Sequence, residues 1–87
     1  MIFDLQLFAE FIEHQTPAQL RKGIRSFKRR IAEHQHKIEN PWTVYEDWFS
    51  APEQQRGRIK HWQHELQNFE ESVRIRIDEL AKRGERP

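Results

Sequence analysis

The chain has 87 residues, of which 33% are charged and 36% hydrophobic, and its formal net charge is +1. The absence of cysteine excludes disulfides, thiolate zinc sites and a cysteine nucleophile. Apolar residues recur at helical spacing, which favours amphipathic helices over disorder. The partly apolar start is interrupted by polar residues and is too short for a membrane span, so a soluble protein without a membrane partner is expected.

The N-terminal segment, residues 1–15, has an ambiguous pattern. Phe3, Leu5 and Leu7 alternate as in a strand, whereas Leu5, Phe8, Phe11 and Ile12 fall on one helical face. A single strand without a sheet is unfavourable in an otherwise helical chain, so a short N-terminal helix is predicted. It should cover the open side of a helical hairpin, either within the monomer or exchanged into a dimer.

The segment 16–40 is predicted to form the first long helix, over about 17–39. Thr16 can cap the free backbone amides, Pro17 suits the first helical position, and Gln19 can complete a capping box. A proline that follows the segment ends the helix. The apolar stripe of this helix comprises Leu20, Ile24, Phe27, Ile31, His34 and Ile38.

The segment 52–84 is predicted to form the second long helix, over about 52–83. Ser50 is the expected N-cap, Pro52 repeats the start pattern, and Gly84 acts as the C-terminal stop. The apolar stripe comprises Ile59, Trp62, Leu66, Phe69, Val73, Ile77 and Leu80.

One part of the second helix also alternates as a strand would. Residues 73–78 alternate apolar and polar side chains, but the helical stripe continues through Val73 and Ile77, so the helix is preferred. Ile75 then lies off the stripe, and it is expected to face a third element or a partner.

The two stripes match in reverse order, as an antiparallel hairpin requires. Phe27 is predicted to pair with Phe69, and His34 with Trp62. The predicted fold is therefore all-α: one domain with a long, coiled-coil-like hairpin and a short N-terminal helix, as a three-helix bundle or a dimeric helical bundle.

The connector, residues 41–51, carries four large aromatic side chains, although connectors are usually short and polar. One interpretation is that the rings fold over the hairpin as a lid. The other is that one or two rings stay exposed as anchors for a protein partner. The predicted partner-binding residues are Trp42, Tyr45, Trp48, Phe49 and, from the second helix, Ile75.

The first helix also carries a run of basic residues. These side chains can share one broad helical surface and meet phosphates or an acidic partner. The nearly neutral chain and the lack of a known reading-helix signature make nucleic acid the weaker interpretation. The predicted residues of this basic surface are Arg21, Lys22, Arg25, Lys28 and Arg29.

Neither metal binding nor catalysis is predicted. His61 and His64 are three residues apart, and His34 and His36 point to opposite sides of a helix, which matches no established zinc motif. No nucleophile with a base, phosphate-binding glycine loop or convergent pair of carboxylates is recognisable. We therefore predict no catalytic residue, no metal ligand and no cofactor.

Several segments resemble a helical module of phages and prophages of Gram-positive bacteria. The resemblance lies in residues 22–27, 37–41, 59–62 and 78–84, together with Glu33-His34 and Asn68-Phe69. That module is found near head-associated proteins and polymorphic-toxin-type proteins, and the opening residues 3–10 separately resemble the start of many phage structural proteins. The resemblance implies a phage setting and carries no catalytic residue over.

The function expected from these observations is non-enzymatic binding of a partner protein, from phage or host, through the hairpin and its aromatic connector. A phage inhibitor of a host defence nuclease, such as an anti-CRISPR protein, is one alternative. A nucleic-acid-binding protein that uses the basic surface is another. The expected location is the host cytoplasm or the virion, and a homodimer is compatible with the pattern.

Overall fold

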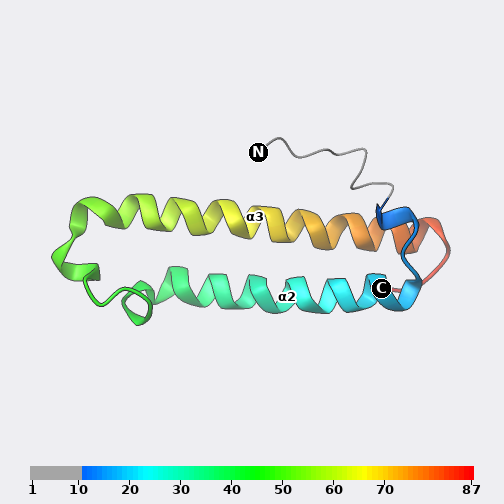
Figure 1. The fold of residues 1–87 in the computed structure, drawn as a ribbon, viewed down its shortest axis with the longest axis horizontal. Helices are drawn as coiled ribbons and strands as arrows, with labels where there is room; N and C mark the ends of the chain where they lie inside the picture. Colours follow the sequence, from blue (N-terminus) through cyan, green and yellow to red (C-terminus); the bar gives the residue numbers. More distant parts are fainter. Residues whose placement is uncertain (1–10) are drawn as a thin grey trace.

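The computed structural model describes residues 11–87, and two long antiparallel helices dominate it (Figure 1). Helix α2 spans Pro17–Glu39 and helix α3 spans Pro52–Lys82. Two short 3-10 helices, η1 (Pro41–Thr43) and η2 (Trp48–Ser50), lie in the connector. The predicted all-α hairpin is confirmed, with both helices in the predicted ranges.

The start of α2 is fixed by a complete capping box. The Gln19 amide donates to Thr16 Oγ1 at 3.1 Å, and the Thr16 amide donates to Gln19 Oε1 at 2.9 Å. Pro17 occupies the first turn, where its missing N–H costs no helical hydrogen bond. These local interactions explain why the predicted start of this helix is correct.

The start of α3 differs from the prediction, because Ser50 does not cap it. The N-cap residue is Ala51, and no side chain caps the helix. Ser50 belongs to η2, where its hydroxyl donates to the Asp47 carbonyl at 3.1 Å. The hydroxyl is therefore used within the connector, two residues before the helix begins.

The end of α3 has the geometry of a Schellman motif. Gly84 has a φ of +74°, and the Gly84 amide donates to the Ala81 carbonyl at 3.0 Å. The Glu85 amide donates to the Leu80 carbonyl at 2.8 Å. This pattern needs a left-handed residue after the helix, so Gly84 is the stop that the sequence predicts.

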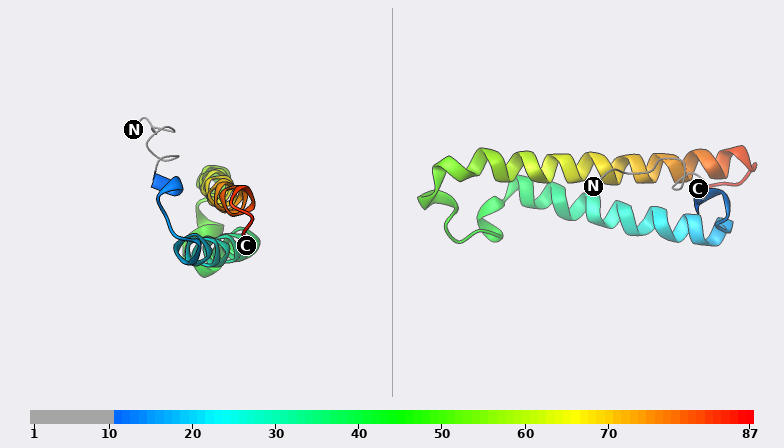
Figure 2. Two further views of the ribbon diagram at one scale, coloured as in Figure 1. Left: turned by 90° about the vertical axis from the view of Figure 1, so that its right-hand side faces the viewer. Right: turned by 45° about the horizontal axis from the view of Figure 1, so that its top comes forward.

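The core lies toward the end of the hairpin that is remote from the connector. Ile12 packs there with residues of both long helices, and residues 11–13 are helical. Figure 2 shows this turn beside the two helices. Residues 11–13 thus pack against one side of the hairpin, with Ile12 buried and Phe11, predicted on the same helical face, 55% exposed. The part of the predicted N-terminal helix before residue 11 lies outside the described residues. The buried cluster comprises Ile12, Leu20, Ile24, Val73 and Leu80.

The two stripes meet largely as predicted. The rings of Phe27 and Phe69 lie 5.8 Å apart between centroids, which confirms this pair. The ring partners of the neighbouring pair differ from the prediction: His34 meets Phe69 edge-on at 4.9 Å, whereas Trp62 stacks on Tyr45 at 5.5 Å. Trp62 is thus covered by the connector, an element whose course the stripes do not specify.

No strand forms within residues 11–87, so the helical interpretation of residues 73–78 is correct. None of the helices in this part of the chain combines the length and the hydrophobicity needed to cross a lipid bilayer.

Candidate interaction surfaces

The four connector rings divide into two that face inward and two that face outward. Trp48 is only 8% exposed. Tyr45 is half-buried and stacks on Trp62 with an angle of 23° between the rings. The lid interpretation therefore describes Tyr45 and Trp48, which seal the hairpin at its connector end.

Arg58 of α3 fastens this inner half of the connector. Its Nη1 and Nη2 atoms donate to the two carboxylate oxygens of Asp47 at 2.9 and 3.2 Å. The Arg58 guanidinium carbon also lies 3.8 Å from the centroid of the Tyr45 ring. The hydrogen bond from Arg58 lowers the pKa of Asp47, which keeps this carboxylate charged. The connector is thus held to α3 and has a defined shape.

The outer half of the connector presents an apolar surface. Trp42 is 49% exposed and Phe49 is 75% exposed, and their rings stack on one another at 6.1 Å with an angle of 21°. Val44, in the same connector, is 46% exposed. We call Trp42, Val44 and Phe49 the tip patch. Exposed apolar side chains grouped in this way are typical of interaction sites.

Acidic side chains lie close to the tip patch in the sequence. Glu39 precedes Trp42 by three residues, Glu46 precedes Phe49 by three, and Glu53 follows Phe49 by four. All three are exposed, and none forms an ion pair with another residue in the described range 11–87. The connector end of the molecule therefore combines exposed rings with exposed acidic side chains.

Four of the five predicted basic-surface residues are exposed. Within residues 11–87 none of these four has an ion-pair partner, whereas Arg21 pairs with Glu85 at 2.9 Å and also donates to the Arg86 carbonyl. Arg21 thus ties α2 to the C-terminal residues. The four available cations are Lys22, Arg25, Lys28 and Arg29.

Other cations of the hairpin lie over aromatic rings. The Arg30 guanidinium lies 5.3 Å from the Phe27 ring centroid, and the Lys37 ammonium lies 6.0 Å from that of Trp62. Such contacts contribute to stability, so these two side chains take part in the scaffold.

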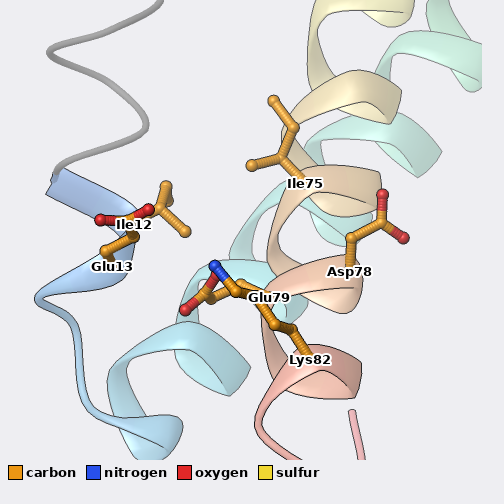
Figure 3. A pocket seen from close by; sticks show the side chains of 6 residues that line it. All are labelled: Ile12, Glu13, Ile75, Asp78, Glu79 and Lys82. Atoms are coloured by element: carbon orange, nitrogen blue, oxygen red, sulfur yellow. The ribbon is translucent and has the colours of Figure 1, made fainter.

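Ile75 faces a third element, which is one of the two outcomes expected for it. The residue is half-buried, packs against the core and lines a pocket of about 200 Å³ together with Ile12. Figure 3 shows its side chain on the side of α3 where the N-terminal turn lies. Ile75 is therefore part of the contact that docks residues 11–13.

Arg83 is a key residue that the sequence analysis did not single out. Its guanidinium donates to the backbone carbonyls of Ile12, Glu13 and Gln15, at 3.2, 2.8 and 2.6 Å. Its Nε atom donates to Glu79 Oε1 at 2.9 Å. Arg83 thus satisfies carbonyls at the end of the N-terminal turn and attaches this turn to α3. We call this group of contacts the Arg83 clamp.

Three titratable side chains meet across the hairpin near its middle. Glu65 contacts the Nε2 atoms of both His34 and His61 at 2.5 Å. His34 is 7% exposed, and its Nδ1 atom lies 3.1 Å from the Arg30 carbonyl. The two ring nitrogens of His34 thus face the Arg30 carbonyl and the Glu65 carboxylate. The hydrogen bond with His34 lowers the pKa of Glu65.

This histidine–glutamate group has the contacts of an ion pair. Among residues 11–87, no three histidine or acidic side chains converge as ligands for a metal ion. The group therefore joins α2 to α3, with Glu65 placed between the two imidazoles.

Comparisons of the chain with family models, with curated proteins and with solved structures found no match.

Proposed function

We propose that this protein acts without catalysis, by binding a partner protein through the tip patch. The observation that carries the proposal is the stacked and exposed pair of Trp42 and Phe49 on a connector whose other two rings are packed inward. Because Arg58 and Asp47 hold the connector in place, binding would order few additional side chains. Large aromatic residues of this kind supply much of the affinity at protein interfaces.

The chemistry around the tip patch specifies the partner further. A surface that receives Trp42 and Phe49 needs an apolar recess, and Glu39, Glu46 and Glu53 favour basic side chains at its rim. The resemblance to a phage module supports a partner from the phage or from its bacterial host.

The proposal is tested by capture with tagged protein from phage-encoding host cells. The double variant Trp42→Ser, Phe49→Ser should keep the helicity and the melting temperature and lose a protein that the wild type retains. The matched control is Phe11→Ser, because Phe11 is 55% exposed at the other end of the hairpin. If the double variant captures the same proteins as the control, the tip patch is not the interface.

Nucleic-acid binding is the second candidate function, and it is favoured by four exposed cations on α2 that form no ion pair with another residue of the range 11–87. The expected result is an affinity for duplex DNA that falls steeply as salt rises, and that is lost in Arg25→Glu with Arg29→Glu. The matched control is Arg56→Glu with Lys60→Glu, which removes two exposed cations from α3. Absence of binding at low salt would exclude this candidate.

A further inference from the structure

We propose that a second copy of this chain packs antiparallel along the outer face of α2. This face is a stripe of side chains three or four residues apart; at about 100° per residue, it lies roughly a third of a turn around α2 from the buried residues Leu20, Ile24 and His34. Every member of the stripe is exposed. The outer face comprises Arg25, Lys28, Ala32, His36 and Glu39.

The described part of the chain leaves this face uncovered. The N-terminal turn packs on another side of the hairpin, where Ile12 meets Ile75 and Glu79 of α3. Figure 2, viewed along the hairpin, shows that turn and α3 on the same side of α2. Within residues 11–87 the proposed face is exposed from Arg25 onward and is available there to a second molecule, whereas Arg21, one turn earlier, contacts Glu85 and Arg86.

The charge along the outer face changes sign from one end to the other. Arg25 and Lys28 lie in the first half of α2, whereas Glu39 ends the helix and Glu46 follows in the connector. A parallel copy would place like charges together. An antiparallel copy places Arg25 of each helix near Glu39 of the other, so these two charges fit this orientation.

Ala32 marks the centre of the proposed contact. Arg25 precedes Ala32 by seven residues and Glu39 follows it by seven, so two helices that cross at Ala32 bring Arg25 of each copy to Glu39 of the other. Lys28 and His36 each lie four residues from the same centre. The small and exposed Ala32 side chain permits close approach of the two helices at the crossing point.

The symmetry makes the assembly a closed dimer. In a twofold antiparallel pair, each Arg25–Glu39 contact occurs twice, and no complementary surface is left to add a third copy. The area in contact extends along one helix face of each copy, so the expected dimer is weak and salt-sensitive.

Sedimentation velocity over a concentration series tests the proposal with charge-reversal variants. The wild type should show a monomer–dimer equilibrium. Arg25→Glu alone and Glu39→Arg alone should each weaken dimerisation by about tenfold, because each change disrupts two symmetric contacts. The double variant should recover an affinity close to that of the wild type, because the same pairs form with the signs exchanged.

The experiment needs a matched control variant, and two results would contradict the proposed dimer. Arg56→Glu reverses an exposed charge on α3 and should leave the dimer unchanged. A wild type that stays monomeric up to about 1 mM would overturn the proposal. A dimer whose affinity is not restored in the double variant would also overturn the proposal. A dimer formed through another surface would give this result.

The experiment also separates this inference from the other two functions. Sedimentation of purified protein requires no other partner, so a failure here leaves capture through the tip patch untouched. If the cations of α2 serve nucleic acid instead, Glu39→Arg strengthens DNA binding and leaves the protein monomeric.

Discussion

Gly23 shows how a single residue can be required by a contact from the other helix. Arg76 of α3 is only 6% exposed; its guanidinium lies 4.8 Å from the Phe27 ring centroid, and its Nη1 atom donates to the Ser72 carbonyl at 3.0 Å. A Cβ atom at Gly23 would lie 2.6 Å from Arg76 Nε and 3.0 Å from its Cδ. Burial lowers the pKa of Arg76, which shows how far this cation has been removed from water. Glycine at position 23 therefore makes room for the Arg76 side chain.

Replacing each of the two helical glycines by alanine should have opposite effects on stability. At Gly57 nothing lies within 4 Å of an added Cβ, so Gly57→Ala should stabilise the protein by about 0.5–1 kcal/mol through helix propensity. Gly23→Ala should destabilise it by about 1–2 kcal/mol, because the buried arginine must move. Urea unfolding of both variants measures the difference. Equal gains at the two positions would show that Arg76 moves without cost.

Glu65 should make the stability depend on pH in the acidic range. Its carboxylate faces His34 and Lys37 from α2 and His61 from its own helix, and the hydrogen bond with His34 is the main reason why its pKa lies below the ordinary 4.5. A lowered pKa in the folded state contributes stability above pH 4.5 that is lost as the pH falls through the folded-state value.

The variant Glu65→Gln tests this contribution by thermal unfolding from pH 7 to pH 3. It should be less stable than the wild type at pH 7, and its melting temperature should fall less below pH 4.5, the ordinary pKa of the lost group. Glu70→Gln, an exposed change on the same helix, is the control and should follow the wild type. Parallel curves for all three proteins would contradict the role of Glu65.

At the level of single residues, the sequence predicts those structural roles that depend on residues close by in the chain. Thr16 and Gln19 are three residues apart, and Gly84 follows the C-cap residue of α3, so their roles follow from local pattern. Arg76 and Arg83 act on residues far away in the chain, and an arginine in an amphipathic helix is normally taken as exposed. The one available signal was Gly23, an unfavourable residue inside a strongly predicted helix.

The connector acts as an element with two sides, and two variants should separate them. Trp48→Ala removes a buried ring and should cost about 3–5 kcal/mol of unfolding free energy. Phe49→Ala removes a 75% exposed ring and should change the stability by less than about 0.5 kcal/mol. Chemical denaturation measures both. If Phe49→Ala proves as costly as Trp48→Ala, the tip patch is part of the core and cannot serve as an interface.

The Arg83 clamp holds a second element, the N-terminal turn. Arg83→Ala should destabilise the protein by about 2 kcal/mol, because carbonyls of that turn lose charged donors. Arg83→Lys should recover only part of this loss, since an ammonium cannot reproduce the planar fork. Lys82→Ala is the neighbouring control. Hydrogen exchange should show lower protection at the N-terminal turn in Arg83→Ala alone, and unchanged protection there would refute the clamp.

At the level of elements, the positions of the helices could be predicted from the sequence, whereas the contacts that the connector makes with them could not. Proline positions and apolar periodicity locate α2 and α3, because both signals are local. Ser50 resembles an N-cap by position, but η2 uses its hydroxyl before the helix begins. Which connector rings face inward depends on contacts with α3, such as Arg58 on Tyr45, which periodicity does not encode.

The whole molecule is long and narrow, with a radius of gyration of 16.3 Å and a longest extent of 51 Å. A compact domain of this length has a radius of gyration of about 12 Å. Side-by-side dimerisation along α2 should therefore leave the longest dimension near 51 Å, whereas end-to-end contact through the tip patches would nearly double it. Small-angle X-ray scattering of the dimer distinguishes the two, and a doubled length would contradict contact through the outer face of α2.

The Arg83 clamp also has a consequence for the order of folding. Arg83 and Ile12 are separated by 71 residues, whereas Arg58 and Asp47 at the connector are separated by only 11. Closing the short loop costs less chain entropy, so pairing of the helices should begin at the connector and proceed toward the termini. The N-terminal turn would then dock last and detach first, and unfolding would start at the end of the molecule where residues 12–15 contact Arg83.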